Sequence, residues 1–252
     1  MKEIILKVKE IPELGIEADV ISPDVFAGKS MNEIGDLETY LGNRREKLNK
    51  FFELRGNSSM KPEDLRIVVE GDVSGVKRIG EGMSAGEILV KDNVGMHLGS
   101  KMKGGEITVE GDSASWVGME MTGGKITIKG NAGNYVGSAY RGNWEGMKDG
   151  EINILGDVGS NSGGCMTGGS IIINGNADEF LGVRMDGGLI TVDGVVSSRT
   201  GAEMHSGSII VNGKIKEMLP SFRREKSSEK KGFIKYTGDL AENGEGRIYV
   251  KE

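Results

Sequence analysis

Side chains that bind metals or act as nucleophiles are scarce in this sequence of 252 residues. It contains two histidines, His97 and His205, and one cysteine, Cys165. A zinc site needs three or four such ligands around one point, and a reactive thiol needs a neighbouring group that lowers its pKa. We therefore predict no metal site, and we expect Cys165 to be an inert thiol that faces solvent or a partner.

Nucleotide-binding motifs are incomplete as well. The run Ala27-Gly28-Lys29-Ser30 resembles the end of a phosphate-binding loop, but Pro23 stands where the first glycine is required. No G-x-G-x-x-G motif follows a strand-like segment. The sequence therefore predicts no catalytic, cofactor-binding or metal-binding residue on this chain.

Composition narrows the class of protein further. The net charge of −6 argues against a nucleic-acid partner, which would require an excess of Lys and Arg. No apolar run approaches the roughly 18 residues of a membrane helix, and the first residues do not form a signal peptide. A single cysteine excludes an internal disulfide and fits a reducing compartment. We expect a cytoplasmic protein that does not bind a membrane.

Glycine accounts for 42 residues, and the methionines show how these glycines are organised. Seven methionines recur at intervals of 19 residues, apart from one interval of 26. A glycine usually stands three residues before each methionine and always three residues after it, followed by an apolar-x-apolar segment. One unit reads G-x-x-M-x-x-G-x-I-x-V-x-G. Its methionines are Met83, Met102, Met121, Met147, Met166, Met185 and Met204.

A unit of this length cannot bury its own apolar face, so successive units must stack. The short strands and tight connections predict an all-β fold, a parallel solenoid of about seven coils. Strand alternation turns the Ile and Val positions inward, and the methionines form an axial core column. All four prolines lie outside residues 63–219, which we take as the solenoid limits. Residues 1–62 then form a small α+β cap, with a strand at 3–9 and a helix within 31–53. Residues 220–252 form a linker and two strands, at 233–236 and 247–251.

Aromatic side chains suggest where the solenoid meets a partner. Trp116, Tyr135 and Phe180 fall in one column next to inward-facing residues, so alternation turns them outward. The long unit contains an insertion of seven residues. We predict a subunit interface formed by Trp116, Tyr135, Tyr140, Arg141, Trp144 and Phe180. The alternative is that the terminal segments fold back and cover these residues.

The repeat resembles that of the C subunit of formylmethanofuran dehydrogenase, an enzyme of methanogenic archaea. The lead-in from Ile21 to Ser30 and the tail Tyr236-Thr237-Gly238-Asp239 also resemble this family. The resemblance implies a right-handed parallel β-helix within a multisubunit oxidoreductase. That enzyme reversibly reduces CO2 with methanofuran to N-formylmethanofuran, with electrons from ferredoxin-type clusters.

The same resemblance implies a division of labour in the complex. The tungsten or molybdenum pterin, the iron–sulfur clusters and a dinuclear zinc-type centre would lie on other subunits. These are a pterin-bearing catalytic subunit, an amidohydrolase-like subunit and ferredoxin-like subunits. We therefore expect this chain to be a non-catalytic structural subunit that scaffolds its partners.

Two alternatives remain open. The glycine repeat is shared with the carboxy-terminal domain of the glutamate synthase large subunit, so the chain could couple active sites in another multisubunit oxidoreductase. An independent β-helical lyase or acyltransferase is less well supported. Acyltransferases use six-residue repeats, and no column provides the charged groove of a lyase.

Overall fold

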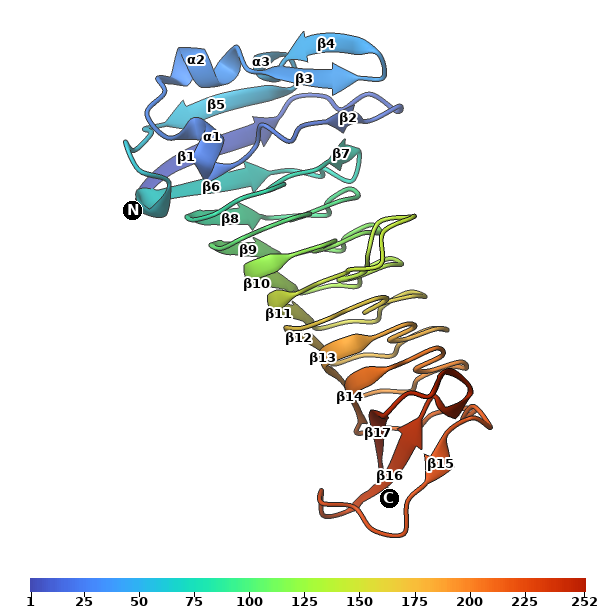
Figure 1. Ribbon diagram of the computed structural model, residues 1–252. Helices are drawn as coiled ribbons and strands as arrows, with labels where there is room; N and C mark the ends of the chain where they lie inside the picture. Colours follow the sequence, from blue (N-terminus) through green and yellow to red (C-terminus); the bar gives the residue numbers. More distant parts are fainter.

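The computed structural model describes residues 1–252, and almost all of its regular structure is β. One sheet of 13 strands runs the length of the molecule, and its strands are mainly parallel (Figure 1). A second sheet has four strands. The centre of the large sheet consists of one strand from each methionine repeat: β8 (Glu87–Val90), β9 (Glu106–Val109), β10 (Thr122–Ile128), β11 (Asp149–Ile154), β12 (Ser170–Ile173), β13 (Asp186–Val192) and β14 (Ser206–Val211).

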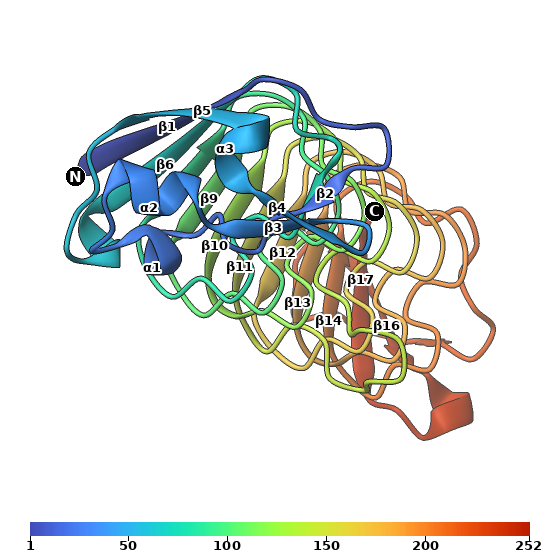
Figure 2. The same ribbon diagram turned by 90° about the horizontal axis from the view of Figure 1, so that it is seen from above.

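Successive repeats pair in register. Ile107 on β9 lies opposite Ile88 on β8 and opposite Ile126 on β10. A second row of parallel bridges links each repeat to the next, including the bridges of Ser113 to Val94 and to Ala132. The chain therefore passes once per repeat through the large sheet and once through the row of bridges, and the repeats lie one above another (Figures 1 and 2).

The core is a continuous column of apolar side chains inside this stack. On β9, Ile107 and Val109 have no exposed surface, whereas Thr108 between them is half-buried on the outer face. Methionine suits the axial position because its unbranched side chain adjusts to the repeats above and below. All seven repeat methionines have no exposed surface: Met83, Met102, Met121, Met147, Met166, Met185 and Met204.

Tight turns in each repeat require left-handed backbone. Gly118 has φ +61°, and a Cβ atom added there would overlap Ile152 Cδ1 of the next repeat. Three bulky residues of one column are also left-handed: His97, Trp116 and Tyr135 have φ of 65°, 72° and 64°. This conformation costs a non-glycine residue about 1–2 kcal/mol, so other contacts must stabilise it.

The amino-terminal segment extends the large sheet and covers its end. β1 (Lys2–Val8) pairs parallel with β6 (Leu65–Glu70), which pairs with β8. β5 (Phe52–Gly56) pairs antiparallel with β1 and forms the edge, against which the helices α2 (Met31–Gly35) and α3 (Leu48–Phe51) pack. The remaining elements are α1 (Pro23–Phe26), the 3₁₀ turn η1 (Pro62–Asp64) and the small sheet of β2 (Ile16–Glu17), β3 (Glu38–Leu41), β4 (Arg44–Lys47) and β7 (Val76–Lys77).

The predicted helix within 31–53 is only partly correct. Two short helices stand at its ends, but β3 and β4 form an antiparallel hairpin between them. The turn lies at Gly42, whose φ is +60°. The spacing of Leu37, Leu41, Leu48 and Phe52 suggested a helix, but the Gly42-Asn43 pair at the turn is a hairpin signal.

The carboxy-terminal segment covers the other end. β17 (Gly246–Lys251) pairs parallel with β14, as a further repeat would. β16 (Phe233–Gly238) then pairs antiparallel with β17, and β15 (Arg223–Arg224) forms the edge. The 3₁₀ turn η2 (Leu240–Glu242) connects β16 to β17. The strands expected at 3–9, 233–236 and 247–251 are therefore confirmed with small changes of bounds. None of the helices combines the length and apolar character needed to cross a bilayer.

Candidate interaction surface

A column of stacked rings lies on one corner of the stack of repeats. The ring of Trp116 stacks on that of Tyr135, with centroids 4.1 Å apart and planes inclined by 8°. The ring of His97 stacks on the other face of Trp116, at 5.8 Å and 12°. The backbone N–H of Trp116 donates to the carbonyl of Asn134 in the next repeat, at 2.9 Å. Ring contacts and backbone hydrogen bonds together stabilise the left-handed corner.

Trp116 was expected at the surface from its place in the sequence, and the structure corrects that expectation. Its side chain points away from the apolar core but is only 7% exposed. The two stacked neighbours cover its faces, and the ring of Tyr140 lies 5.9 Å away at 52°. Strand alternation predicts the direction in which a side chain points. It does not predict whether an insertion folds back and covers that side chain. Tyr135 and Phe180 are half-buried.

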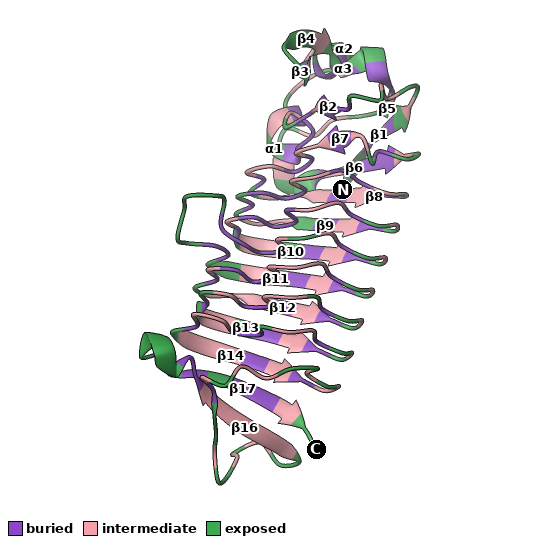
Figure 3. Cartoon of the chain, turned by 90° about the vertical axis from the view of Figure 1, so that its right-hand side faces the viewer, coloured by how far each residue is buried: buried purple, intermediate pink, exposed green.

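The insertion that contains Tyr140 is fixed to the neighbouring repeats at both ends. The carboxylate of Glu120 accepts hydrogen bonds from the Tyr140 backbone N–H at 3.2 Å and from Asn143 Nδ2 at 2.8 Å. At the other end, the Gly146 N–H donates to the Cys165 carbonyl at 2.7 Å. The exposed loop projects from the side of the stack near β10 (Figure 3).

Two aromatic residues of this loop are presented to solvent. Tyr140 is 53% exposed and Trp144 is 67% exposed. The guanidinium of Arg184 lies 4.9 Å from the Trp144 ring and is also paired with Glu203 at 2.7 Å. Arg141 is exposed beside them. Tyr, Trp and Arg dominate the energy of protein interfaces, so this loop has the composition of a contact site.

Phe180 lies further along the same column and is not part of the ring stack. The guanidinium of Arg199 covers its ring at 5.0 Å and is paired with Glu179 at 3.0 Å. Asn161 separates Phe180 from Tyr135 in the column. The six residues that were predicted as one interface therefore divide into a covered stack, an exposed loop and this isolated ring.

The structure does not bring His97, Cys165 and His205 together, and no group of three or more His, Cys, Asp or Glu side chains forms a possible metal site. Burial, with a smaller effect from Arg78, lowers the pKa of His97, so its imidazole is neutral near pH 7. Burial raises the pKa of the half-buried Cys165 thiol. A thiol in this state is a poor nucleophile. The Ser30 of the phosphate-loop-like run caps α2 in a capping box with Glu33.

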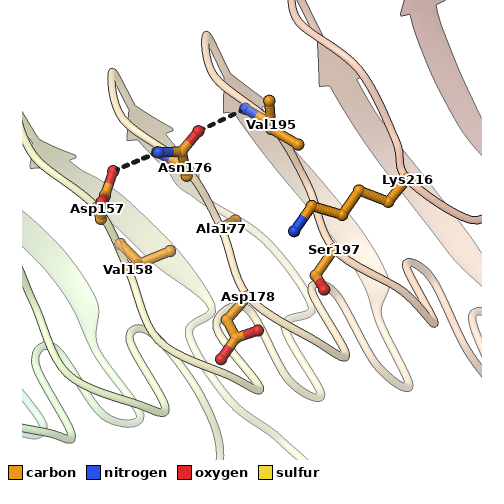
Figure 4. Close-up of a pocket in the computed structure, with 8 residues that line it drawn as sticks. All are labelled: Asp157, Val158, Asn176, Ala177, Asp178, Val195, Ser197 and Lys216. Atoms are coloured by element: carbon orange, nitrogen blue, oxygen red, sulfur yellow. Dashed lines mark hydrogen bonds between the residues drawn. The ribbon is translucent and has the colours of Figure 1, made fainter.

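A polar ladder follows another corner, and it was not predicted from the sequence. Each Asn or Asp just after the turn glycine accepts a hydrogen bond from the backbone N–H of its counterpart one repeat later. Asp157 accepts from Asn176 at 2.7 Å, and Asn176 accepts from Val195 at 2.8 Å (Figure 4). The recurrence of Asn or Asp after the turn glycine was the available signal.

An open hollow of about 430 Å³ lies beside this ladder. Asp178, Ser197 and Lys216 line its other side (Figure 4). Asp178 already accepts a hydrogen bond from the Ser160 hydroxyl at 3.1 Å. The hollow offers polar groups to solvent, but it does not converge them on one point as a catalytic site requires.

Comparison with known proteins shows which proteins this chain is related to. The C subunit of tungsten-containing formylmethanofuran dehydrogenase 2 from Methanothermobacter wolfeii is 52% identical over 99 residues, which are 39% of this chain and 37% of the relative. The tungsten enzyme's C subunit from Methanococcus maripaludis is 53% identical over 148 residues, 58% of this chain and 53% of the relative. The chain is a homologue of the formylmethanofuran dehydrogenase C subunit. The resemblance inferred from the repeat is thereby confirmed.

Molybdenum enzymes also have a homologous C subunit. That of molybdenum-containing formylmethanofuran dehydrogenase 1 from Methanosarcina barkeri is 46% identical over 98 residues, 39% of this chain and 33% of the relative. The aligned part of this chain thus spans about a third to a half of the length of these relatives. No family model matches the chain.

A solved structure matches this homologue of the C subunit over nearly its full length. It is a chain in the crystal structure of the formyltransferase/hydrolase complex FhcABCD from Methylorubrum extorquens with methylofuran. The two chains superpose with a TM-score of 0.91 and 28% identity, over 98% of this chain and 99% of the other.

Proposed function

We propose that this chain is a non-catalytic structural subunit of a formylmethanofuran dehydrogenase complex, in the cytoplasm. The complex would reversibly reduce CO2 with methanofuran to N-formylmethanofuran. In this proposal the fold is a right-handed parallel β-helix, because parallel crossovers are almost always right-handed. Residues 63–219 form the β-helix, 1–62 the cap, and 220–252 the linker and terminal strands.

The observation that carries the proposal is the homology to the C subunits of both tungsten and molybdenum enzymes, at 46–53% identity. The architecture fits a scaffold. Each repeat bonds to the next through the strand and the bridge, and the Asn/Asp ladder adds a third row of bonds from Asn93 to Val195, which favours a rigid stack. A rigid surface can hold catalytic partners in fixed relation.

The cofactors are assigned to other subunits. The names of the relatives indicate tungsten or molybdenum enzymes, and the donors on this chain do not converge as a metal ligand set requires. We place the pterin on a catalytic subunit, a dinuclear zinc-type centre on an amidohydrolase-like subunit, and the iron–sulfur clusters on ferredoxin-like subunits. The residues of this chain would bind and orient those subunits.

The contact with one partner is assigned to the exposed loop. Tyr140, Arg141 and Trp144 form its tip, and Arg184 supports the Trp144 ring from the adjacent repeats. Phe180 and Arg199 extend the surface along the column. Trp116 and Tyr135 would act from beneath, by holding Tyr140 in place.

Co-expression of the tagged chain with the other subunits tests this proposal. The wild-type chain should capture them in fixed stoichiometry, and Trp144→Ala should weaken capture of one subunit at least tenfold. Tyr40→Ala is the matched control, because Tyr40 is also an exposed aromatic, at 41%, but lies on the cap hairpin. A wild-type chain that captures no subunit would refute the scaffold role. Full capture by Trp144→Ala would refute the loop assignment.

A second candidate function has a specific observation in its favour. The full-length structural match belongs to a formyltransferase/hydrolase complex, so this chain could scaffold an assembly of that kind. Metal analysis of the purified complex distinguishes the two candidates. Stoichiometric tungsten or molybdenum supports the dehydrogenase, and their absence from an active formyltransferase supports the second candidate.

A further inference from the structure

The outer face of the large sheet changes character along its length. Every strand of the stack turns equivalent side chains outward in three positions, two on the strand and one just beyond it. On β8, β9 and β10, six of these nine residues are charged: they are Glu87, Leu89, Lys91, Glu106, Thr108, Glu110, Lys125, Thr127 and Lys129.

β11 forms the boundary, with Glu151, Asn153 and Leu155 at the three outward positions. Beyond it the same face is almost free of charge. On β12, β13 and β14, one of the nine equivalent residues is charged: they are Ser170, Ile172, Asn174, Leu189, Thr191, Asp193, Ser208, Ile210 and Asn212. That single carboxylate, of Asp193, accepts hydrogen bonds from Asn174 at 3.2 Å and from Asn212 at 2.7 Å.

The charged half of the face pairs its charges with each other and with those of the adjoining strands β6 and β11. Lys91 contacts Glu70 at 2.8 Å, and Lys129 contacts Glu110 at 3.0 Å. Lys125 contacts Glu151 at 2.9 Å. Such ladders suit a face that meets water. The fold therefore accepts charge at these positions.

Leucines replace these charges in the second half, although the positions stay exposed. Leu155 follows β11 where β10 has Lys129, and it is 50% exposed. Leu189 on β13 stands in the column of Glu87, Glu106 and Glu151 and is 37% exposed. Depletion of charge and exposure of apolar groups distinguish the centre of a protein interface from the surrounding surface.

A cationic border adjoins this neutral face. Arg247 and Lys251 point outward from β17, next to β14, and neither forms an ion pair. Lys235 on β16 and Arg223 on β15 stand on the same face, because cross-strand partners share a side. Lys235 is paired with Glu229 at 3.2 Å and Arg223 with Glu225 at 3.0 Å, so the unpaired cations of the border are Arg247 and Lys251. Arg223, Lys235 and Arg247 line one hollow of about 680 Å³, whose only acidic residue is Glu245.

We infer that the outer face of β12–β14 and the adjoining Leu155, with this cationic border, docks a second partner subunit. The fitting surface is uncharged at its centre and carries carboxylates on the side that meets Arg247 and Lys251 of β17. A second copy of the chain fits less well, because a two-fold axis at β13 would place β17 against β11, whose one outward carboxylate, of Glu151, is already paired with Lys125. This inference rests on the proposed scaffold function and extends it.

The neutral face and the exposed loop lie on different sides of the stack. The strands occupy one side in the end-on view, and the turns that include the insertion lie away from them (Figure 2). Two separated docking surfaces would let one rigid chain join two subunits that do not touch each other.

The tagged chain, co-expressed with the subunits of the complex, tests the inference. Leu155→Glu combined with Leu189→Glu is the test variant, since other repeats carry charge at both positions and the fold tolerates it there. The control is Thr127→Glu, a half-buried outward residue of the charged half. The test variant should bind one subunit at least tenfold more weakly and keep the subunit that Trp144→Ala releases. The control should retain both, and all variants should melt within a few degrees of the wild type.

Arg247→Glu provides an independent test. This substitution should weaken the binding of the same subunit and reduce the salt dependence of that binding. Retention of every subunit by both variants would overturn the inference while leaving the scaffold role intact. A wild-type dimer in light scattering that the leucine variant converts to a monomer would overturn it too, because the occupant would be a second copy. Failure of the wild-type chain to capture any subunit would instead refute the scaffold role, and this inference with it.

Discussion

The indole of Trp116 lies flat on the phenol of Tyr135, its counterpart one repeat later, with ring centroids 4.1 Å apart. Both residues have left-handed backbone, and both are followed by a buried valine of the core. The ring pair thus joins two consecutive turns from the outside while the valines join them from the inside. Trp116 is a structural residue as well as the support of the exposed loop.

Trp116→Ala should therefore lower the free energy of unfolding by about 3–5 kcal/mol, the usual cost of truncating a buried Trp. Trp144→Ala should change it by less than about 0.5 kcal/mol, because Trp144 is 67% exposed. Urea unfolding followed by circular dichroism measures both. Equal losses of stability in the two variants would contradict the assignment of Trp116 to the structure and Trp144 to the surface.

Met121→Glu should destabilise the chain by more than about 4 kcal/mol, because it buries an unpaired carboxylate in the axial core. Thr127→Glu, on the outer face of the same repeat, should be nearly neutral, since Lys125 and Lys129 flank it. Thermal unfolding compares the two variants. Similar melting temperatures would show that the methionine column is not the core.

Gly118→Ala should cost about 2–5 kcal/mol. Its left-handed backbone disfavours a Cβ atom, and that atom would collide with Ile152 Cδ1. Gly142→Ala in the loop should cost only about 1 kcal/mol, because Gly142 has φ +87° but no neighbour within 4 Å of the added atom. Equilibrium unfolding in urea distinguishes the two effects. A Gly142 variant as unstable as the Gly118 variant would mean that backbone strain alone sets the cost.

The carboxylate of Glu229 holds the loop between β15 and β16 against β17. It accepts a hydrogen bond from the Tyr249 hydroxyl and contacts Lys235 Nζ at 3.2 Å. The Tyr249 hydrogen bond, with its own backbone N–H and Lys235, lowers the pKa of Glu229 to about 2. Burial and the same hydrogen bond raise the pKa of Tyr249 to about 12.

The stabilisation of this loop should therefore depend on pH at both extremes. The folded pKa of Glu229 lies below its ordinary 4.5. Its contribution to the free energy of unfolding is therefore complete above pH 4.5 and disappears as the pH falls towards 2. The folded pKa of Tyr249 lies above its ordinary 10.0, so its contribution is complete below that pH and is lost as the pH rises through 12. Tyrosinate absorbance should show Tyr249 titrating near pH 12, and Glu229→Gln should lower that value. An unchanged titration in Glu229→Gln would contradict the contact.

The repeat made the central sheet predictable. Because every unit must bury the same apolar positions, one alignment of Met83 to Met204 fixed the inward residues, the register and the likeness to the C subunit family. The ends were harder to predict. β6 and β17 join the parallel sheet without a repeat methionine, since a strand pairs by backbone geometry and needs only Ile67 or Ile248 to face the core.

The candidate site was predictable in composition but not in exposure. The insertion was visible as a longer interval, and the structure shows that its Tyr140 and Trp144 are exposed. The burial of Trp116 depends on Tyr140 folding back over it through the hydrogen bonds of Glu120, and no periodic pattern encodes such a contact. The change from charged to neutral on the outer face was present in the sequence, but its meaning depends on the strand register.

The most direct test of the central claim, that this chain positions catalytic subunits without reacting itself, is the activity of a reconstituted complex. Its chain would carry His97→Gln, Cys165→Ala and His205→Gln together, which removes every imidazole and thiol. If the chain only positions its partners, the complex should form formylmethanofuran at the wild-type rate with unchanged subunit stoichiometry. A large loss of kcat in a fully assembled complex would contradict it.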